Sequence, residues 1–183
     1  MITLTSADIL ALLKKNGLEP GNVEYEVVER LREKNLKVAT AESCTGGLIS
    51  ERITRVSGAS EVFDCGFCSY ANEIKEKLLG VRHDTLSILG AVSAETAIQM
   101  AEGVKKLSGA DITVSVTGIA GPTGGTSEKP VGLVFLGICS ETDAYAVKLL
   151  LGGENDRGFI RAMASTAALF MVLEEAHKYI VIE

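Results

Sequence analysis

Residues 37–47 read Lys37-Val38-Ala39-Thr40-Ala41-Glu42-Ser43-Cys44-Thr45-Gly46-Gly47, and this stretch decides the fold. A strand-like run that ends near Ala41 passes directly into an amphipathic helix, which we expect over about 45–56. Two candidate nucleophiles, Ser43 and Cys44, lie at the helix start, where unpaired N–H groups and the helix dipole favour a negative charge. Serine and threonine are also preferred helix caps. A capped helix start and an anion or oxyanion site both remain open here.

The pattern on either side of this junction alternates between helices and strands. We expect helices over about 6–16 and 22–34 before it, and strands near 61–70, 111–117, 131–139 and 144–150 after it. Further helices are predicted over about 71–79, 84–89, 93–108 and 155–177. This order predicts an α/β layered domain with a mixed sheet, preceded by N-terminal helices. We expect a helical extension over residues 1–22 and a single domain over residues 23–183.

Composition narrows the class of protein. The 183 residues, 46% hydrophobic and 23% charged, suit one domain, and no run of 18 apolar residues occurs. The net charge is −6 and the longest basic run is two residues, so we expect neither nucleic acid nor membrane as a partner. The N-terminus lacks a secretory pattern, and we therefore expect a cytoplasmic protein.

The cysteines and histidines do not predict a metal or a redox site. Cys65 and Cys68 have C-x-x-C spacing, but they lie in a predicted strand, where residues three apart face opposite sides. The two histidines, His83 and His177, are in no cluster with the spacing of metal ligands. We expect no metal and no cofactor.

Four segments are predicted to border one cleft. Ser43, Tyr70 and Thr117 each fall at the C-terminal end of a predicted strand, the end at which open α/β sheets bind ligands. If these strands are parallel, the segments after them converge. The predicted hairpin at 140–143 brings a further strand, and with it residues 152–157, back to the same edge.

The polar residues of these segments can each be interpreted either as functional groups or as ordinary structural residues. Lys75 lies three residues after Asn72, on the same helix face, and either reaches the cleft or is a solvated surface lysine. Tyr70 is either a functional phenol or a half-buried packing residue. The glycine-rich loop from Thr117 to Gly132 is long enough to suggest a task, because its amides can form an anion nest. Arg157 is either a phosphate or carboxylate clamp or a partner of Glu154 or Asp156.

A serine–lysine mechanism suits these residues better than a serine–histidine one. The chain has no Gly-x-Ser-x-Gly elbow and no Ser-x-x-Lys sequence, and neither histidine is near a predicted cleft segment. With Ser43 as nucleophile, Lys75 has to be neutral to take its proton, so its pKa must fall by about 2 to 3 from the usual value. The amides of residues 44–47 would then hold the oxyanion. Cys44 is the rival nucleophile.

An ordered set of motifs resembles the CinA C-terminal-domain family of nicotinamide-nucleotide amidases, over about residues 24–177. The motifs are 41–47, Tyr70-x-Asn72-x-x-Lys75, 90–93, 117–125 and 128–132. The resemblance implies an α/β/α fold and hydrolysis of nicotinamide mononucleotide to nicotinic acid mononucleotide and ammonia, without a metal. It implies catalytic roles for Ser43, Lys75 and Tyr70. Substrate-binding positions are then expected at Cys44, Thr45, Gly46, Gly47, Asn72, Thr117, Gly118, Gly121 and Arg157.

Two departures and two alternatives accompany this resemblance. The chain resembles a stand-alone form, so we do not expect the pyrophosphatase activity of the domain that precedes this module in longer members. The family's Gly-Asp-Arg is replaced by Gly153-Glu154-Asn155-Asp156-Arg157, which weakens the assignment of Arg157.

We expect a homo-oligomer acting on a small nucleotide. The alternatives are a non-catalytic nucleotide-binding module and an interaction scaffold that uses the N-terminal helices.

Overall fold

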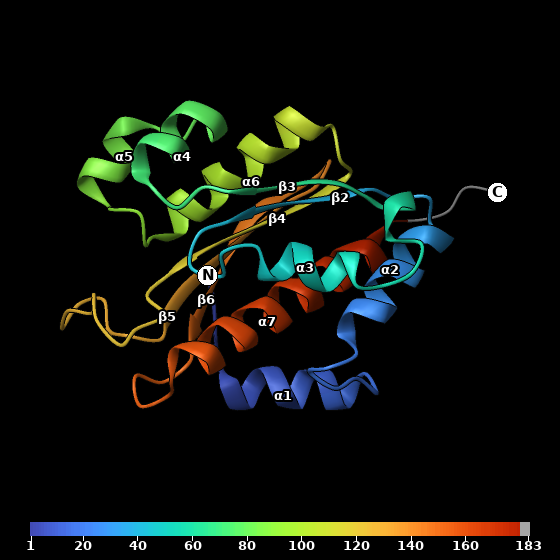
Figure 1. Cartoon of the computed structure of the whole chain (residues 1–183), viewed down its shortest axis with the longest axis horizontal. Helices are drawn as coiled ribbons and strands as arrows, with labels where there is room; N and C mark the ends of the chain where they lie inside the picture. Colours follow the sequence, from blue (N-terminus) through green and yellow to red (C-terminus); the bar gives the residue numbers. More distant parts are fainter. Residues whose placement is uncertain (180–183) are drawn as a thin grey trace.

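The computed structural model describes residues 1–179, which form one six-stranded sheet between two layers of helices (Figure 1). The strands are β1 (Ile2–Thr5), β2 (Val38–Glu42), β3 (Phe63–Cys68), β4 (Ile112–Gly118), β5 (Leu133–Cys139) and β6 (Ala144–Leu150). The helices are α1 (Ser6–Lys15), α2 (Val23–Glu33), α3 (Leu48–Thr54), α4 (Asn72–Leu79), α5 (His83–Ile88), α6 (Ala94–Ser108) and α7 (Arg157–Lys178). The predicted α/β sandwich with a mixed sheet is confirmed.

Each face of the sheet is covered by its own group of helices. Helix α6 lies along one face of the sheet, with α4 and α5 beside it, and α7 crosses the other face together with α1, α2 and α3 (Figure 1). The long helices α6 and α7 are capped by Ser93 and Asp156, whose side chains accept hydrogen bonds from the N–H groups of Thr96 and Phe159. Such caps satisfy amides that a helix start otherwise leaves unpaired.

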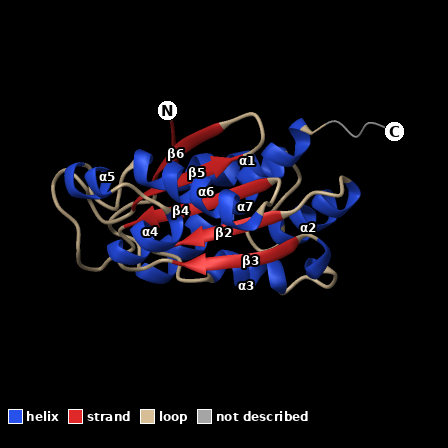
Figure 2. Ribbon diagram, turned by 90° about the horizontal axis from the view of Figure 1, so that it is seen from above, coloured by secondary structure: helices blue, strands red, loops and turns tan. Residues whose placement is uncertain are grey.

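The sheet order is β1-β6-β5-β4-β2-β3, and β5 alone runs against the others. Strands β2, β3 and β4 are parallel neighbours, as Figure 2 shows. The hairpin from β5 to β6 turns the chain back, so that β6 ends at the edge where β2, β3 and β4 also end. The predicted convergence of four segments at one edge is therefore confirmed.

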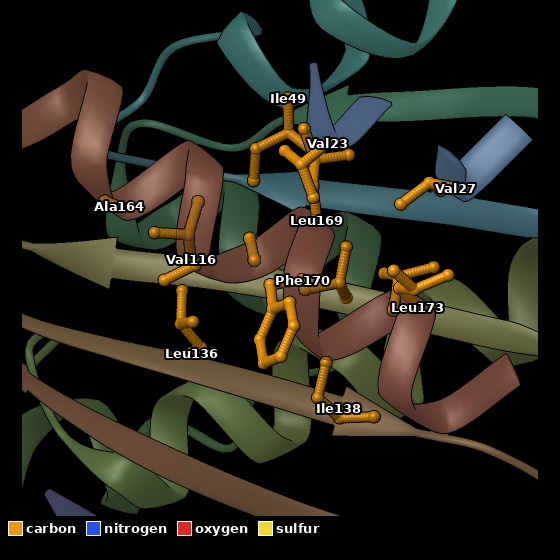
Figure 3. Packing of buried hydrophobic residues seen from close by; sticks show 14 of the residues in the cluster. Val23, Val27, Ile49, Val116, Leu136, Ile138, Ala164, Leu169, Phe170 and Leu173 are labelled. Carbon is orange, nitrogen blue, oxygen red and sulfur yellow. The ribbon is translucent and has the colours of Figure 1, made fainter. Parts of the chain in front are cut away.

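The main hydrophobic core lies between the sheet and α7. Phe170, Leu169 and Leu173 of α7 pack with strand residues such as Leu136 and Ile138 (Figure 3). The predicted apolar face of α2, formed by Val23, Val27, Val28 and Leu31, is buried in the same cluster. Each such side chain contributes about 1.5 to 3 kcal/mol when it is removed from water. This core fixes the sheet on which the converging loops are built.

Three boundaries differ from the prediction. Residues 2–5 form β1, which pairs in parallel with β6, and the four-residue run was too short to register as a strand beside the helix signal at Ser6. Helix α3 begins at Leu48 rather than near Thr45, because Gly46 and Gly47 have left-handed φ angles of 60° and 94°. Helix α5 begins at His83 rather than at Asp84, with Arg82 at the N-cap position and no side-chain capping hydrogen bond.

No helix within residues 1–179 combines the length and the apolar character needed to cross a membrane.

Candidate active site

The turn that follows β2 carries Ser43. The N–H of Ser43 donates to the carbonyl of Val116 on β4 at 3.0 Å, which extends the strand pairing by one residue. The N–H of Gly46 then donates back to the Ser43 carbonyl at 3.1 Å. Glycine suits the left-handed conformations of positions 46 and 47, because other residues pay a steric cost there. The sequence thus makes a tight turn that presents Ser43 at the sheet edge, half-buried.

The carboxylate of Glu42 occupies the start of α3. It is fully buried, and Oε2 accepts from Thr45 Oγ1 (2.6 Å) and from the N–H groups of Gly47 and Ile49 (3.0 and 3.1 Å). Oε1 accepts from the N–H and the hydroxyl of Ser50 at 2.8 and 2.7 Å. The protein's own carboxylate therefore takes the helix N-terminus that the sequence suggested for a ligand anion or an oxyanion. The Gly46 and Gly47 amides are already used.

Lys75 of α4 is 1% exposed and reaches Ser43. Its Nζ lies 3.2 Å from Ser43 Oγ, 2.7 Å from the Ser69 carbonyl and 3.1 Å from the Tyr70 carbonyl. No carboxylate pairs with it among the described residues. Burial lowers the pKa of Lys75, because the charged amine loses hydration. The interpretation of Lys75 as a solvated surface lysine is therefore wrong.

Cys44 has the opposite setting. It is 6% exposed, and burial raises the pKa of Cys44 to about 12, despite a partly offsetting hydrogen bond from its own N–H. A thiol with such a pKa is almost wholly protonated near pH 7, and the thiolate is the nucleophilic form. Of the two neighbouring candidates, the geometry therefore favours Ser43.

Tyr70 and Arg157 meet across the cleft. Arg157, the first residue of α7, donates to the Gly121 carbonyl at 2.8 Å and to the Tyr70 hydroxyl at 3.2 Å. Tyr70 is 65% exposed, which excludes the packing explanation. These contacts replace the suggested pairing of Arg157 with Glu154 or Asp156. They tie the end of β3, the glycine-rich loop and α7 into one rim.

A cavity of about 270 Å³ lies inside this rim. Its lining residues are Cys44, Tyr70, Gly118, Ile119, Ala120, Gly121, Thr123, Gly124 and Arg157. This volume is close to the lower end of the usual range for small-molecule sites. Ser43 and Lys75 are not among these lining residues, but Cys44 follows Ser43 directly and the Tyr70 carbonyl contacts Lys75. A larger hollow of about 480 Å³ lies along α6 near Arg82 and Glu95, and its lining includes none of the predicted site residues.

The other predicted binding positions have varied surroundings. The Thr117 hydroxyl is buried and donates to the Ala91 carbonyl at 2.7 Å, so it fastens β4 to the start of α6 rather than facing the cavity. Gly118 lies in close contact with Val134, where a side chain would collide. Asn72 is exposed at the start of α4, and its side chain makes no hydrogen bond within residues 1–179.

Sequence reasoning missed Arg161. Its guanidinium donates from Nε and Nη2 to the Thr45 carbonyl at 3.2 and 2.5 Å. Arg161 follows Arg157 by four residues on α7, and this spacing places both side chains on one helix face. That spacing was the available signal. Together the two arginines contact the nucleophile turn and the rim.

The two C-x-x-C cysteines do not form a shared site. The burial of β3 alternates, with Cys65 packed against the α4–α6 side and Cys68 exposed beside Gly47. Both are free thiols. Within the part of the chain that the structure describes, no group of three or more His, Cys, Asp or Glu side chains is placed to hold a metal ion.

Comparison with known proteins identifies relatives over most of the chain. The family described as CinA C-terminal domain matches residues 21–176. A CinA-like protein of Kosmotoga olearia is 53% identical over 156 residues, which cover 85% of this chain and 37% of that protein. A CinA-like protein of Thermotoga sp. (strain RQ2) is 47% identical over 164 residues, 90% of this chain and 38% of that protein. This chain thus spans well under half the length of these curated relatives.

Solved structures show the same fold. The competence/damage inducible protein CihA from Agrobacterium tumefaciens superposes with a TM-score of 0.83 at 41% identity, over 87% of this chain and 96% of that one. The competence damage-inducible protein A (ComA) from Klebsiella pneumoniae gives a TM-score of 0.83 at 28% identity, over 88% of this chain and 99% of that one.

Proposed function

We propose, from the premise that this chain belongs to the CinA C-terminal domain family, that it is an amidohydrolase acting on nicotinamide mononucleotide. The products would be nicotinic acid mononucleotide and ammonia. The substrate comes from the resemblance to nicotinamide-nucleotide amidases. The observation that carries a serine mechanism is the 3.2 Å contact between Ser43 Oγ and the buried Nζ of Lys75.

The surroundings of Lys75 suit a group that gains and loses a proton. A neutral amine has two N–H donors and one lone pair. The Ser69 and Tyr70 carbonyls can accept the two donors, which leaves the lone pair for the Ser43 hydroxyl. After proton transfer the ammonium donates to the same three oxygens. The proton can therefore move without a rearrangement of the site.

The proposed reaction has two stages. Ser43 Oγ attacks the carboxamide carbon while Lys75 takes the hydroxyl proton, and the C–N bond then breaks as ammonia leaves with a proton supplied through Lys75 and Tyr70. Water attacks the resulting ester with Lys75 again as base, which releases the carboxylate and restores Ser43. The exposed Tyr70 hydroxyl accepts from Arg157 and keeps its own O–H to donate.

The rim would hold the rest of the nucleotide. The glycine-rich loop lines the cavity, and Arg157 uses one N–H toward Gly121 and one toward Tyr70. A guanidinium carries five N–H donors, so donors remain for a ribose phosphate. We accordingly propose that Arg157 both organises the rim and contacts the phosphate.

Ammonia release and product mass test this function. We expect wild-type protein to convert nicotinamide mononucleotide with and without a chelator, and we expect Ser43→Ala to lose at least about 10³-fold in kcat. Cys44→Ala is the matched control and should stay within about threefold. Ser43→Ala with near-normal turnover would rule out the serine mechanism. Tight binding of the nucleotide by a wild-type protein that releases no ammonia would instead support a nucleotide-binding module.

A further inference from the structure

The backbone amides of the nucleophile turn are not equally available. The N–H of Ser43 is paired with Val116, that of Gly46 with Ser43, and that of Gly47 with Glu42. The N–H groups of Cys44 and Thr45 have no acceptor on another residue among residues 1–179. Both residues are buried, and buried amides are nearly always paired in proteins. Two donors beside a candidate nucleophile, that of Thr45 without an acceptor in the described part of the chain and that of Cys44 paired only with its own thiol, are suited to an anionic oxygen.

Thr45 is held from two sides. Its hydroxyl donates to Glu42 Oε2 at 2.6 Å, and its carbonyl accepts two hydrogen bonds from Arg161. Glu42 is in turn fixed by four further donors, three backbone N–H groups and the Ser50 hydroxyl. The turn therefore has little freedom to rotate, and the N–H groups of Cys44 and Thr45 keep fixed directions. Preorganised donors of this kind cost no reorientation during a reaction.

We propose that Glu42 is a positioning residue, which acts through the Thr45 hydroxyl to hold the N–H groups of Cys44 and Thr45 as an oxyanion hole. This inference rests on the proposed serine chemistry and deepens it. It replaces the broader expectation that all amides of residues 44–47 serve this role. Glu42 itself touches no substrate, because its two oxygens are directed to the turn and to α3.

Two substitutions each remove one hydroxyl group that donates a hydrogen bond to the Glu42 carboxylate. Thr45→Val keeps the shape of the side chain but deletes its hydrogen bond to Oε2, so the turn that carries Ser43 loses its tie. Ser50→Ala is the matched control, because it deletes the hydroxyl donor to Oε1 within α3 while the Ser50 N–H still donates there. Melting temperatures show whether both variants remain folded at the assay temperature.

The readout is the rate at which a fluorophosphonate labels Ser43, followed by intact mass. Ser43 Oγ attacks phosphorus, a P–O bond forms, the P–F bond breaks, fluoride leaves and the hydroxyl proton goes to Lys75. The phosphoryl oxygen gains charge as the oxygen of an amide would. We expect Thr45→Val to label about 10 to 100 times more slowly than wild type, and Ser50→Ala to stay within about threefold. Glu42→Gln should resemble Thr45→Val.

The outcomes separate this proposal from the amidase proposal. Equal rates for the two hydroxyl variants, with both folded, would overturn the positioning role. A wild type that labels at Ser43 but releases no ammonia from the nucleotide would disprove the amidase function, and the ratio of the two variants would still decide the role of Glu42. A wild type that does not label at Ser43 would overturn the nucleophile and the positioning role together. If ammonia is released, kcat should fall in Thr45→Val with KM unchanged.

Discussion

The Lys75 side chain is buried and contacts three oxygen atoms. Within residues 1–179 no carboxylate pairs with its amine. Because burial holds the pKa of Lys75 below the ordinary lysine value of 10.5, the neutral form becomes available at lower pH than in a free lysine. The proposed amidase needs that neutral form. We therefore expect kcat/KM to rise with pH through a midpoint below 10.5, and Lys75→Met to lose at least about 100-fold in kcat.

The same pKa shift has a consequence for stability. Between the lowered pKa and 10.5 the unfolded chain binds more protons at this site than the folded one, so the contribution of Lys75 to stability rises with pH. Relative to wild type, Lys75→Met should gain stability at pH 7, where the buried amine is more fully charged, and that gain should shrink by pH 10. Urea titrations at the two pH values measure this difference. A gain that grows with pH would contradict a lowered pKa.

At the residue level, the sequence predicted the site residues that can be identified from their own segment, but not the contacts that depend on distant segments. Ser43, Tyr70 and Lys75 were predicted from strand ends and motif order, and the structure brings Lys75 to Ser43 and Tyr70 to Arg157. Glu42 was missed as the acceptor for the turn, because a glutamate at a strand end gives no sign of which amides it will meet. The partner of Arg161, a single backbone carbonyl, equally depends on how α7 crosses the sheet.

At the level of elements, strand ends and long helices were predictable and short elements were not. Asn22 lies at the N-cap position of α2 without a side-chain capping hydrogen bond. The strand β6 and the cap of α6 follow from alternation and from Ser93. The start of α3 did not, since two left-handed glycines and the Glu42 carboxylate together delay it to Leu48. Competition between local propensity and a tertiary partner set that boundary.

The contact between α4 and α6 offers a test at this level. A Cβ added to Gly103 of α6 would collide with the carbonyl group of Leu79 on α4, which lies one turn beyond Lys75. Although alanine favours helices by up to about 1 kcal/mol, backbone cannot move aside as a side chain can. We expect Gly103→Ala to lose about 1 to 3 kcal/mol in stability and to lower kcat by displacing α4.

Gly21→Ala is the control for this substitution, because no heavy atom lies within 4 Å of its added Cβ. Urea denaturation and kcat are measured for both variants. If Gly103→Ala matched Gly21→Ala in both quantities, α4 would not depend on its close approach to α6.

Across the whole molecule, a buried ion pair joins the helices on the α7 side. Arg52 of α3 donates to Glu24 of α2 at 2.5 Å, to Ser165 and Thr166 of α7 at 2.9 and 2.8 Å, and to the Pro20 carbonyl at 2.6 Å. Glu24 is fully buried, and Arg52 is 6% exposed. These contacts connect the helix after the nucleophile turn to the helix that carries Arg157 and Arg161.

Removal of one member of this pair should destabilise the entire domain. Arg52→Met leaves the Glu24 carboxylate buried with only the weaker 3.5 Å contact from Arg55, and such a loss typically costs about 3 to 5 kcal/mol. Arg55→Ala removes the exposed partner of the same carboxylate and should cost no more than about 1 kcal/mol. The double variant Glu24→Met/Arg52→Met removes both charges and should recover most of the loss. Urea denaturation of wild type and the three variants measures these differences. A double variant as unstable as Arg52→Met alone would show that the shape of the pair matters more than its charge.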